Sequence, residues 1–288
     1  QAGMRAAHRR DGVALCRFLA WLDRTAPGGG LTEMSAAARL LSLRAEQDLF
    51  RGESFAAISG AGEHGAIIHY RVTQATDRPL NRNEVYLIDS GGQYQDGTTD
   101  VTRTVWTGPD AAPDAVREQV TRVLRGHIAI ATAVFPQGVA GPHLDAFARR
   151  ALWEAGLDYD HGTGHGVGSY LSVHEGPVSL SRLARPVPLA PGMVLSDEPG
   201  LYISGQYGIR LENLLLVQEM PGFGTRPFLR FETLTLAPFD RRLLDRALLP
   251  AADVAWLDAY HQRVLDEIGP LLDGADRAWL QAACAPLA

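Results

Sequence analysis

The chain has few cysteines and no long apolar segment. Its 288 residues contain only Cys16 and Cys284, near opposite ends, so a disulfide framework is excluded and both thiols are expected to be inert. No apolar run reaches the ~18 residues of a transmembrane helix, and the N-terminus lacks the basic and apolar segments of a signal peptide. These absences predict a protein of the cytoplasm that has no membrane partner.

The sequence also lacks a basic stretch. Its 27 basic residues are scattered among 33 acidic ones and the net charge is -6, which excludes the positively charged stripe that nucleic acid binding requires. The hydrophobic content of 46% is that of an ordinary globular protein, so we expect a folded enzyme or binding domain. Because the chain begins at Gln1 without an initiator methionine, we also expect that sequence upstream of it has been removed.

Apolar periodicity predicts an α+β fold. Helices are expected at residues 4–23, 33–48 (with Thr32 as the cap), 113–134 and 144–155. Strands are expected at residues 56–58, 66–70, 84–89, 101–106, 194–196, 209–217 and 229–236. The strands at 84–89 and 101–106 form a hairpin around an Asp-Gly turn. The pattern is helical from Arg241 onward, and this tail is expected to cover the domain or to form a subunit interface.

Two carboxylates lie in the predicted hairpin. Asp89 ends an apolar strand, where a carboxylate is costly unless it is paired or bound to a cation. Asp100 lies on the returning strand, so the two carboxylates can converge. The alternative is a pair that only caps the turn, and these two residues alone do not decide between the alternatives.

Histidines are concentrated in one glycine-rich segment. His161 and His165 lie in an eight-residue run with four glycines, which is unfavourable for a helix, and His174 follows nine residues after His165. The helical zinc motif is therefore excluded, and the segment is expected to be a loop whose backbone approaches a ligand closely. A single loop histidine is usually only solvated, but this cluster favours a functional site.

Two further carboxylates abut apolar strands. Glu198 follows the strand at 194–196, and Glu212 precedes a run of apolar residues. A same-face ion pair between Arg210 and Glu212 is the structural alternative, but it leaves Glu198 without a partner. Four carboxylates and one imidazole together carry the charge that two divalent cations would balance. The pattern thus predicts a metal centre that comprises Asp89, Asp100, His165, Glu198 and Glu212.

These motifs, taken in order, resemble the pita-bread metallopeptidases of family M24, and among them the Xaa-Pro aminopeptidases of the three-domain type. The resemblance rests on Asp89 to Tyr94, Asp100 to Thr104, His161 to Pro177, Asp197 to Gly200, Gly208 to Asn213 and the tail around Trp256 to Ile268. It implies pseudo-twofold halves with a curved antiparallel sheet that helices cover. A catalytic domain at residues 1–240, a helical extension at 241–288 and the absence of the upstream N-terminal domains are also expected.

The resemblance further implies a binuclear site, commonly of manganese, with zinc or cobalt as alternatives. Asp100 and Glu212 would bridge the metals, Asp89 would complete one, and His165 and Glu198 would complete the other. A metal-bridged hydroxide would cleave the N-terminal Xaa-Pro bond of peptides. The residues expected to take part in catalysis are His69, His174 and Glu198. Those expected to bind substrate are His69, His161, His174 and Arg210. A homodimer through the C-terminal region is a further expectation.

Other functions remain open at this stage. A prolidase, which cleaves only Xaa-Pro dipeptides, shares the five ligands. Methionine aminopeptidase shares them too, although its counterpart of the segment at 208–210 is not expected to read Gly-Ile-Arg. A non-catalytic pita-bread binding module, or a metal-free creatinase-like hydrolase, is less favoured because no ligand position is lost here.

Overall fold

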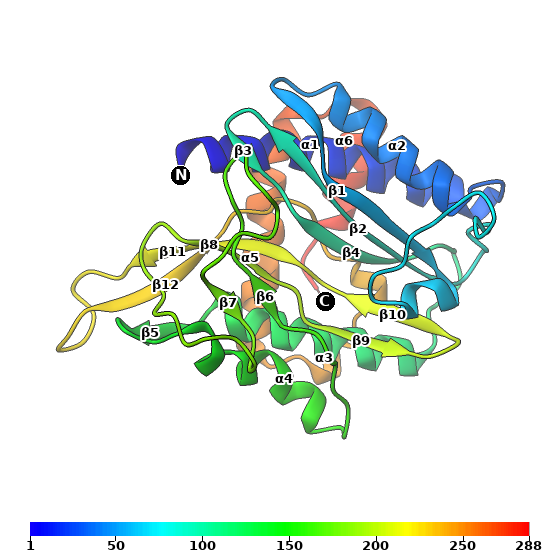
Figure 1. Cartoon of the computed structure of the whole chain (residues 1–288). Coiled ribbons are helices and arrows are strands. Elements are labelled where there is room, and N and C mark those ends of the chain that lie inside the picture. Colours follow the sequence, from blue (N-terminus) through cyan, green and yellow to red (C-terminus); the bar gives the residue numbers. More distant parts are fainter. Residues whose placement is uncertain (288) are drawn as a thin grey trace.

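A computed structural model describes residues 1–287 (Figure 1). Two helices are followed by antiparallel strands, two further helices with one short strand between them are followed by a second set of strands, and two more helices complete residues 1–287. The helices are α1 (Ala2–Thr25), α2 (Glu33–Ala45), α3 (Asp114–Ala131), α4 (Asp145–Trp153), α5 (Ala251–Ile268) and α6 (Gly274–Ala283). The capping prediction for α2 is confirmed, because the Thr32 hydroxyl accepts a hydrogen bond from the backbone N–H of Ser35.

The first half contains a sheet covered by α1 and α2 (Figure 1). Its strands are β1 (Phe50–Ala61), β2 (Val85–Tyr94), β3 (Gly97–Thr98) and β4 (Val101–Trp106). The central strand β2 pairs antiparallel with β1 and β4, and the register places Asp89 between Ile58 and Thr102. The predicted hairpin is therefore confirmed. Leu15, Phe18 and Leu40, among others, bury the apolar faces of the two helices against this sheet.

The second half repeats this arrangement with α3 and α4 (Figure 1). Its strands are β5 (Val134–Pro136), β6 (Gly164–His165), β7 (Ser179–Leu180), β8 (Val194–Asp197), β9 (Gly200–Ile203), β10 (Tyr207–Arg210), β11 (Asn213–Glu219) and β12 (Phe228–Thr233). The main sheet has the order β5-β12-β11-β8, while β9 pairs with β10 and β6 with β7. Leu195, Leu215 and Phe231 lie in the core between the sheet and the helices.

Two strand predictions are wrong. No strand forms at 66–70, because the chain leaves β1 through a 3-10 turn at Gly62–Ala66 and Ile67 is 54% exposed. Instead the Tyr70 hydroxyl donates a hydrogen bond to Glu33, so tertiary contacts determine the conformation of this segment. The expected strand at 209–217 is two strands, since β10 ends at Arg210 and β11 begins only at Asn213. Leu211 and Glu212 lie between the two strands.

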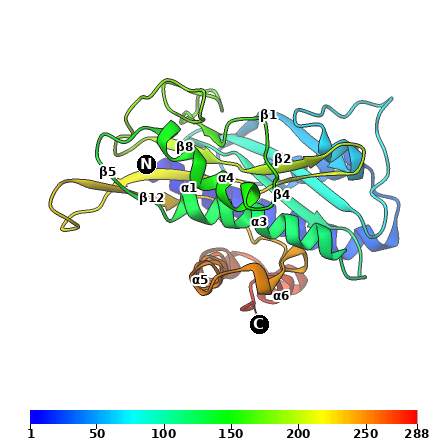
Figure 2. The ribbon, with the colours of Figure 1, turned by 90° about the horizontal axis from the view of Figure 1, so that it is seen from below.

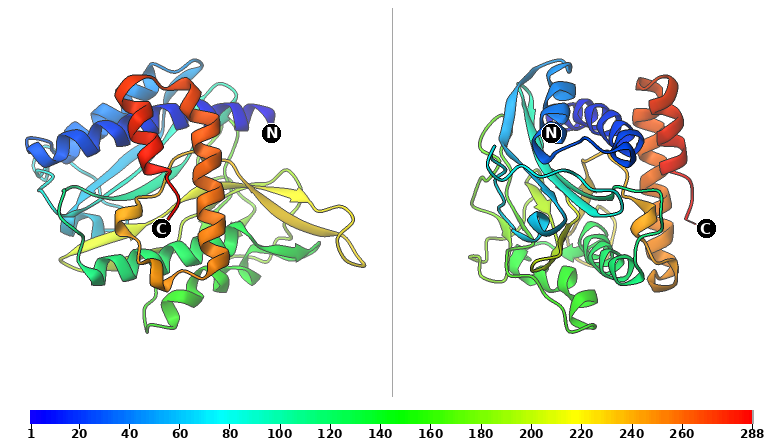
Figure 3. Two further views of the ribbon diagram at one scale, coloured as in Figure 1. Left: turned by 180° about the vertical axis from the view of Figure 1, so that it is seen from behind. Right: turned by 90° about the vertical axis from the view of Figure 1, so that its right-hand side faces the viewer.

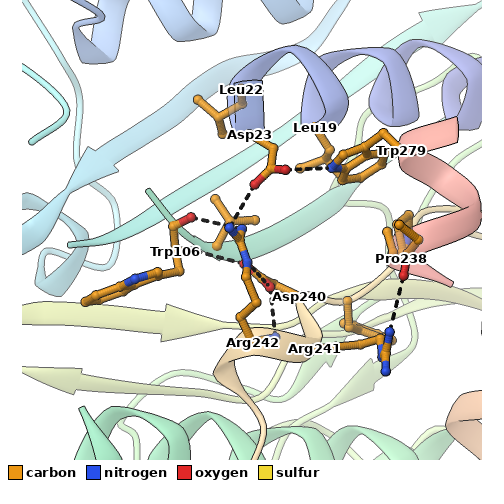
Figure 4. A pocket seen from close by; sticks show the side chains of 13 residues that line it. Leu19, Leu22, Asp23, Trp106, Pro238, Asp240, Arg241, Arg242 and Trp279 are labelled. Carbon is orange, nitrogen blue, oxygen red and sulfur yellow. Dashed lines mark hydrogen bonds and ion pairs between the residues drawn. The ribbon is translucent and has the colours of Figure 1, made fainter. Parts of the chain in front are cut away.

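The C-terminal helices form a layer on one side of the molecule (Figures 2 and 3). Leu257, Val264 and Ile268 of α5 and Leu280 of α6 are buried in a core that also contains residues of α1, α3 and β10. Figure 4 shows the region where the extension begins: Arg242 pairs with Asp23 of α1 at 2.8 Å and with Asp240 at 2.8 Å. A cavity of about 220 Å³ lies there between α1, β4 and α6.

Both cysteines are buried and free. Burial raises the pKa of the Cys16 thiol well above its usual value and that of Cys284 to about 12, so neither thiolate is populated near neutral pH. Among the helices of residues 1–287, none combines the length and the apolar character that crossing a bilayer requires.

Candidate metal centre

A cavity of about 540 Å³ opens between the two halves, with contributions from β2, β6 and β10 and from the loops around them. The residues that line it include all nine predicted site residues: His69, Asp89, Asp100, His161, His165, His174, Glu198, Arg210 and Glu212. They come from segments up to 143 positions apart in sequence, from His69 to Glu212. The fold thus brings the predicted site together in one place.

Asp89 and Arg210 form a buried ion pair at this cavity. Arg210 Nη2 donates to Asp89 Oδ2 at 2.7 Å, with side-chain exposures of 2% and 11%. The alternative pair of Arg210 with Glu212 is therefore wrong: the Arg210 guanidinium pairs with Asp89, whereas the Glu212 carboxylate accepts a hydrogen bond from the Thr102 hydroxyl. Asp89 Oδ1 is buried and has no hydrogen-bond partner among the described residues.

Asp100 and Glu212 lie together at the bottom of the site. Asp100 precedes β4 and Glu212 precedes β11, and both carboxylates are buried, at 5% and 1% exposure. Ligand atoms of Asp100, Glu212 and His165 all lie within 4.8 Å of one another. Thr102 links the two segments, since its hydroxyl donates to Glu212 Oε2 at 2.6 Å and its carbonyl accepts from the Glu212 N–H at 3.2 Å.

His165 is oriented by the loop in which it lies. Its Nδ1 is 2.9 Å from the Gly166 carbonyl oxygen, and a proton on Nδ1 leaves Nε2 free to bind a cation. Nε2 lies 3.4 Å from Asp100 Oδ2 and 3.4 Å from Glu198 Oε1. Glu198 follows β8, and its Oε1 also accepts a hydrogen bond from the Ser196 hydroxyl at 3.0 Å.

The charges in this cluster perturb one another. Burial raises the pKa of Asp100 to about 6 and that of Glu198 to about 7, although His165 opposes both shifts. Burial also raises the pKa of Glu212 well above its usual value, together with the charge of Asp100. For His165, burial lowers the pKa, but the hydrogen bond with Asp100 and the charge of Glu198 prevail and raise it to about 9.

These residues fit a pair of divalent cations. When ionised, Asp100, Glu198 and Glu212 carry more negative charge than His165 can neutralise, since Arg210 already pairs with Asp89. Burial and this mutual repulsion raise the pKa values of all three. The orphaned Oδ1 of Asp89 offers a further oxygen. A set of carboxylate oxygens and one imidazole suits Mn, Co or Zn.

The histidines predicted to contact substrate surround this cluster. The His174 ring packs edge-on against the His165 ring, with centroids 4.1 Å apart, and His69 lies in the loop that follows β1. Burial, together with the charge of Arg210, lowers the pKa of His161 to about 4, so this imidazole is neutral near pH 7. Phe55, Ile58 and Val173 add apolar surface to the same cavity.

Tyr202 is a site residue that sequence reasoning missed. Its hydroxyl lies 2.8 Å from His161 Nε2 and accepts a hydrogen bond from Arg210 Nη1 at 2.7 Å. A tyrosine in a short strand has no sequence signal that distinguishes it from a packing residue. Only the tertiary structure brings it to the site: β9 pairs with β10, and this pairing places Tyr202 opposite Gly208.

The chain matches metallopeptidase family M24 over residues 2–219 and the C-terminal region of peptidase M24 over residues 227–287. The chain belongs to metallopeptidase family M24. Its α+β architecture is the pita-bread fold of that family, as the sequence predicted.

Relatives within the family are similar over nearly all of the chain. It is 49% identical to "Probable Xaa-Pro aminopeptidase P" of Laccaria bicolor and 46% identical to the protein of that name in Aspergillus fumigatus, and each alignment covers 99% of this chain but 45% of the relative. The chain therefore spans less than half the length of these fungal proteins.

Solved structures of other proteins are also similar to this chain. X-prolyl aminopeptidase of Caenorhabditis elegans, described as a cytosolic enzyme with a di-nuclear active site, superimposes with a TM-score of 0.94 and 42% identity, over 99% of this chain and 47% of that one. Prolidase of Thermococcus sibiricus superimposes with a TM-score of 0.68 and 25% identity, over 83% of this chain and 60% of that one.

Proposed function

We propose that the chain is the catalytic part of a Xaa-Pro aminopeptidase, which hydrolyses the bond between the first residue of a peptide and a proline in second position. The observation that carries this proposal is the convergence of all nine predicted residues on one cavity. The similarity to an X-prolyl aminopeptidase over 99% of the chain supports it.

The proposed cofactor is a pair of divalent cations, with manganese as the metal and zinc or cobalt as alternatives. Asp89, Asp100, His165, Glu198 and Glu212 would hold them. When bound, such cations make a coordinated water acidic near neutral pH and polarise the scissile carbonyl.

The protein residues then have distinct tasks. Glu198 accepts a proton from the attacking water, because its carboxylate lines the cavity beside His165 and Asp100. His174 donates a hydrogen bond to the oxyanion that forms at the scissile carbonyl; a neutral imidazole can do so, and burial lowers the pKa of His174. His69 contacts the substrate backbone beside the scissile bond.

Specificity has two sources in this proposal. The free α-amino group of the peptide lies by Asp89 and the cation that this carboxylate would hold, since Asp89 lines the cavity. The proline ring packs against His161 and His174. An uncharged His161 favours this apolar contact, since a buried imidazolium would have to lose its hydration.

Hydrolysis of a Xaa-Pro-Xaa peptide by the manganese-loaded protein tests the proposal. We expect turnover of the tripeptide, slower turnover when alanine replaces proline, and loss of turnover with a chelator. Cleavage of the Xaa-Pro dipeptide alone would instead indicate a prolidase. Fewer than about one divalent ion per purified chain, with no activity after manganese is added, would indicate a non-catalytic binding module.

The remaining proposals concern the whole protein. Residues 1–240 form the catalytic domain and residues 241–288 an extension that packs on it. The enzyme works in the cytoplasm, as the cytosolic relative from C. elegans does. It forms a homodimer through its C-terminal region, which sedimentation of the metal-loaded protein would test.

A further inference from the structure

Behind the metal centre lies a buried polar network around Arg103, a residue of β4 that is 1% exposed. Its Nη1 donates to the carbonyl of Glu212 at 2.7 Å and to the carbonyl of Thr102 at 2.9 Å. One nitrogen therefore joins the segment that follows Asp100 to the segment that carries Glu212. Asp100 and Glu212 are both proposed metal ligands, and their ligand atoms lie within 4.8 Å of each other.

The other nitrogens of Arg103 face the C-terminal part of the chain. Nε donates to the carbonyl of Pro238 at 3.1 Å, and Nη2 donates to that of Ala237 at 2.7 Å. Nη2 also lies 3.1 Å from the hydroxyl of Tyr260, a buried residue of α5. The Tyr260 hydroxyl in turn is 3.0 Å from the Thr235 carbonyl, so the extension closes one side of the network.

The network also reaches the segment of Glu198. Asn213 Oδ1 accepts from Arg103 Nη2 at 2.8 Å, and the Asn213 amide lies 3.1 Å from His127 Nε2. His127 Nδ1 is 3.1 Å from the backbone carbonyl oxygen of Asp197, the residue that precedes Glu198. All of these side chains are at most 1% exposed. Three of the five proposed ligand segments thus share one network.

A guanidinium suits this task better than other cations. Its five N–H groups point in fixed directions in one plane, so acceptors on several segments must keep their relative positions to satisfy it. Burying this charge is costly unless its donors are paired. The ring of Phe239, 4.2 Å from the guanidinium carbon, covers one face. A displaced segment would lose hydrogen bonds that water cannot replace at this depth.

We propose that Arg103 is a positioning residue of the metal centre and that the C-terminal extension takes part in it through Tyr260. The inference rests on the proposed function, because it concerns the same metal-binding residues. It goes further in assigning the extension a task at the active site besides burying apolar surface. Neither side chain needs to touch metal or substrate for this.

The test is the affinity for Mn²⁺, measured without substrate by calorimetric titration of the metal-free protein. Tyr260→Phe removes only the hydroxyl, and Tyr86→Phe is the matched control, since Tyr86 is fully buried and its hydroxyl contacts Ser59 instead. We expect Tyr260→Phe to weaken the tighter Mn²⁺ site by about tenfold, the lower end for outer-shell partners. Tyr86→Phe should bind Mn²⁺ as the wild type does.

Arg103→Lys keeps the charge but removes the planar fork, so it should weaken binding more than Tyr260→Phe and alter the electron paramagnetic resonance spectrum of the manganese pair. Wild-type Mn²⁺ affinity in folded Tyr260→Phe would overturn the inference, as would equal losses in Tyr260→Phe and Tyr86→Phe. Failure of the wild type to cleave Xaa-Pro-Xaa would contradict only the proposed function, because these affinities are measured without peptide.

Discussion

Arg210 of β10 and Asp89 of β2 form an ion pair across 121 residues of sequence, with Nη2 and Oδ2 2.7 Å apart. The second Nη of Arg210 donates to Tyr202, whose hydroxyl contacts His161. Four side chains therefore form a continuous line from the proposed metal ligand Asp89 to the proposed proline pocket. A change at one end of this line should be measurable at the other.

Tyr202→Phe tests this line. Loss of the hydroxyl leaves His161 Nε2 and Arg210 Nη1 without this partner in a buried setting, which costs about 1–3 kcal/mol. We expect kcat/KM for Xaa-Pro-Xaa to fall by about tenfold. Tyr207→Phe is the control, because its hydroxyl bonds to Gln119. Equal kinetics for the two variants would show that the line has no catalytic consequence.

Asp100→Asn should abolish metal binding and hydrolysis. The amide removes one negative charge from the cluster and is a weaker ligand for divalent cations. Metal content of the purified variant and hydrolysis of Xaa-Pro-Xaa are the measurements. Asp266→Asn, at an exposed position of α5, should behave as the wild type. Full activity in Asp100→Asn would refute the ligand assignment.

The affinity for Mn²⁺ should rise as the pH is raised from about 6 to 9. Metal binding displaces protons from the ligands, and the pKa values of Asp100, Glu198 and His165 in the metal-free protein are about 6, 7 and 9. Calorimetric titration in buffers of different ionisation enthalpy counts the released protons. Affinity that does not depend on pH would contradict these values.

The metal-free protein should show the opposite trend in stability. The pKa of His165 is raised above its unfolded value, so its contribution is complete below about pH 6.5 and is lost as the pH rises through 9. Asp100 and Glu198 bind protons more tightly when folded, so ionising them from about pH 4 to 7 also destabilises the native state. The difference in Tm between metal-loaded and metal-free protein should therefore widen with pH.

Gly164→Ala should displace His165. A Cβ at Gly164 would lie 1.9 Å from the Ser196 carbonyl oxygen, closer than any van der Waals contact, and this oxygen belongs to the backbone of β8, which cannot move easily. We expect weaker Mn²⁺ binding and a lower Tm. Gly28→Ala, with no atom within 4 Å of the new Cβ, is the control. Unchanged Mn²⁺ affinity in Gly164→Ala would mean that the loop adapts.

Leu257→Ala should destabilise the whole chain. Leu257 of α5 is fully buried in the core shared with α1 and α3, and removing such a side chain costs about 2–5 kcal/mol. Denaturant unfolding should show a lower midpoint in a single transition. Leu271→Ala, at a position that is 48% exposed, should change the midpoint far less. A separate, earlier transition in Leu257→Ala would show that the extension unfolds alone.

The sequence predicted the five candidate ligands because each has a local signal. Asp89 ends an apolar strand, and His165 lies among glycines that exclude a helix. Arg103 and Tyr202 have no such signal. The sequence pattern around a polar residue on a β-strand is the same whether its side chain is solvated or paired within the core. Their partners lie on elements that only the tertiary fold brings near.

The errors in the strand predictions have a related cause. Short apolar runs have the same composition in a strand, a 3-10 turn or a buried loop. At 66–70, the hydrogen bonds of Tyr70 and the turn at Gly62, where φ is 51°, decide the conformation. At 209–217, two residues interrupt the strand and one of them, Glu212, lines the cavity. Apolar periodicity contains no information about a cavity.

The distribution of the proposed ligands along the chain has a consequence for folding. Asp89 and Asp100 belong to the first half, whereas His165, Glu198 and Glu212 belong to the second, and the long loop closures between them are costly. A chain with only one half folded offers at most three ligands and no enclosed site. The metal would therefore bind late in folding, after the two halves dock. Mn²⁺ binding measured during refolding would then follow the formation of the native tertiary structure and not the formation of helices and strands.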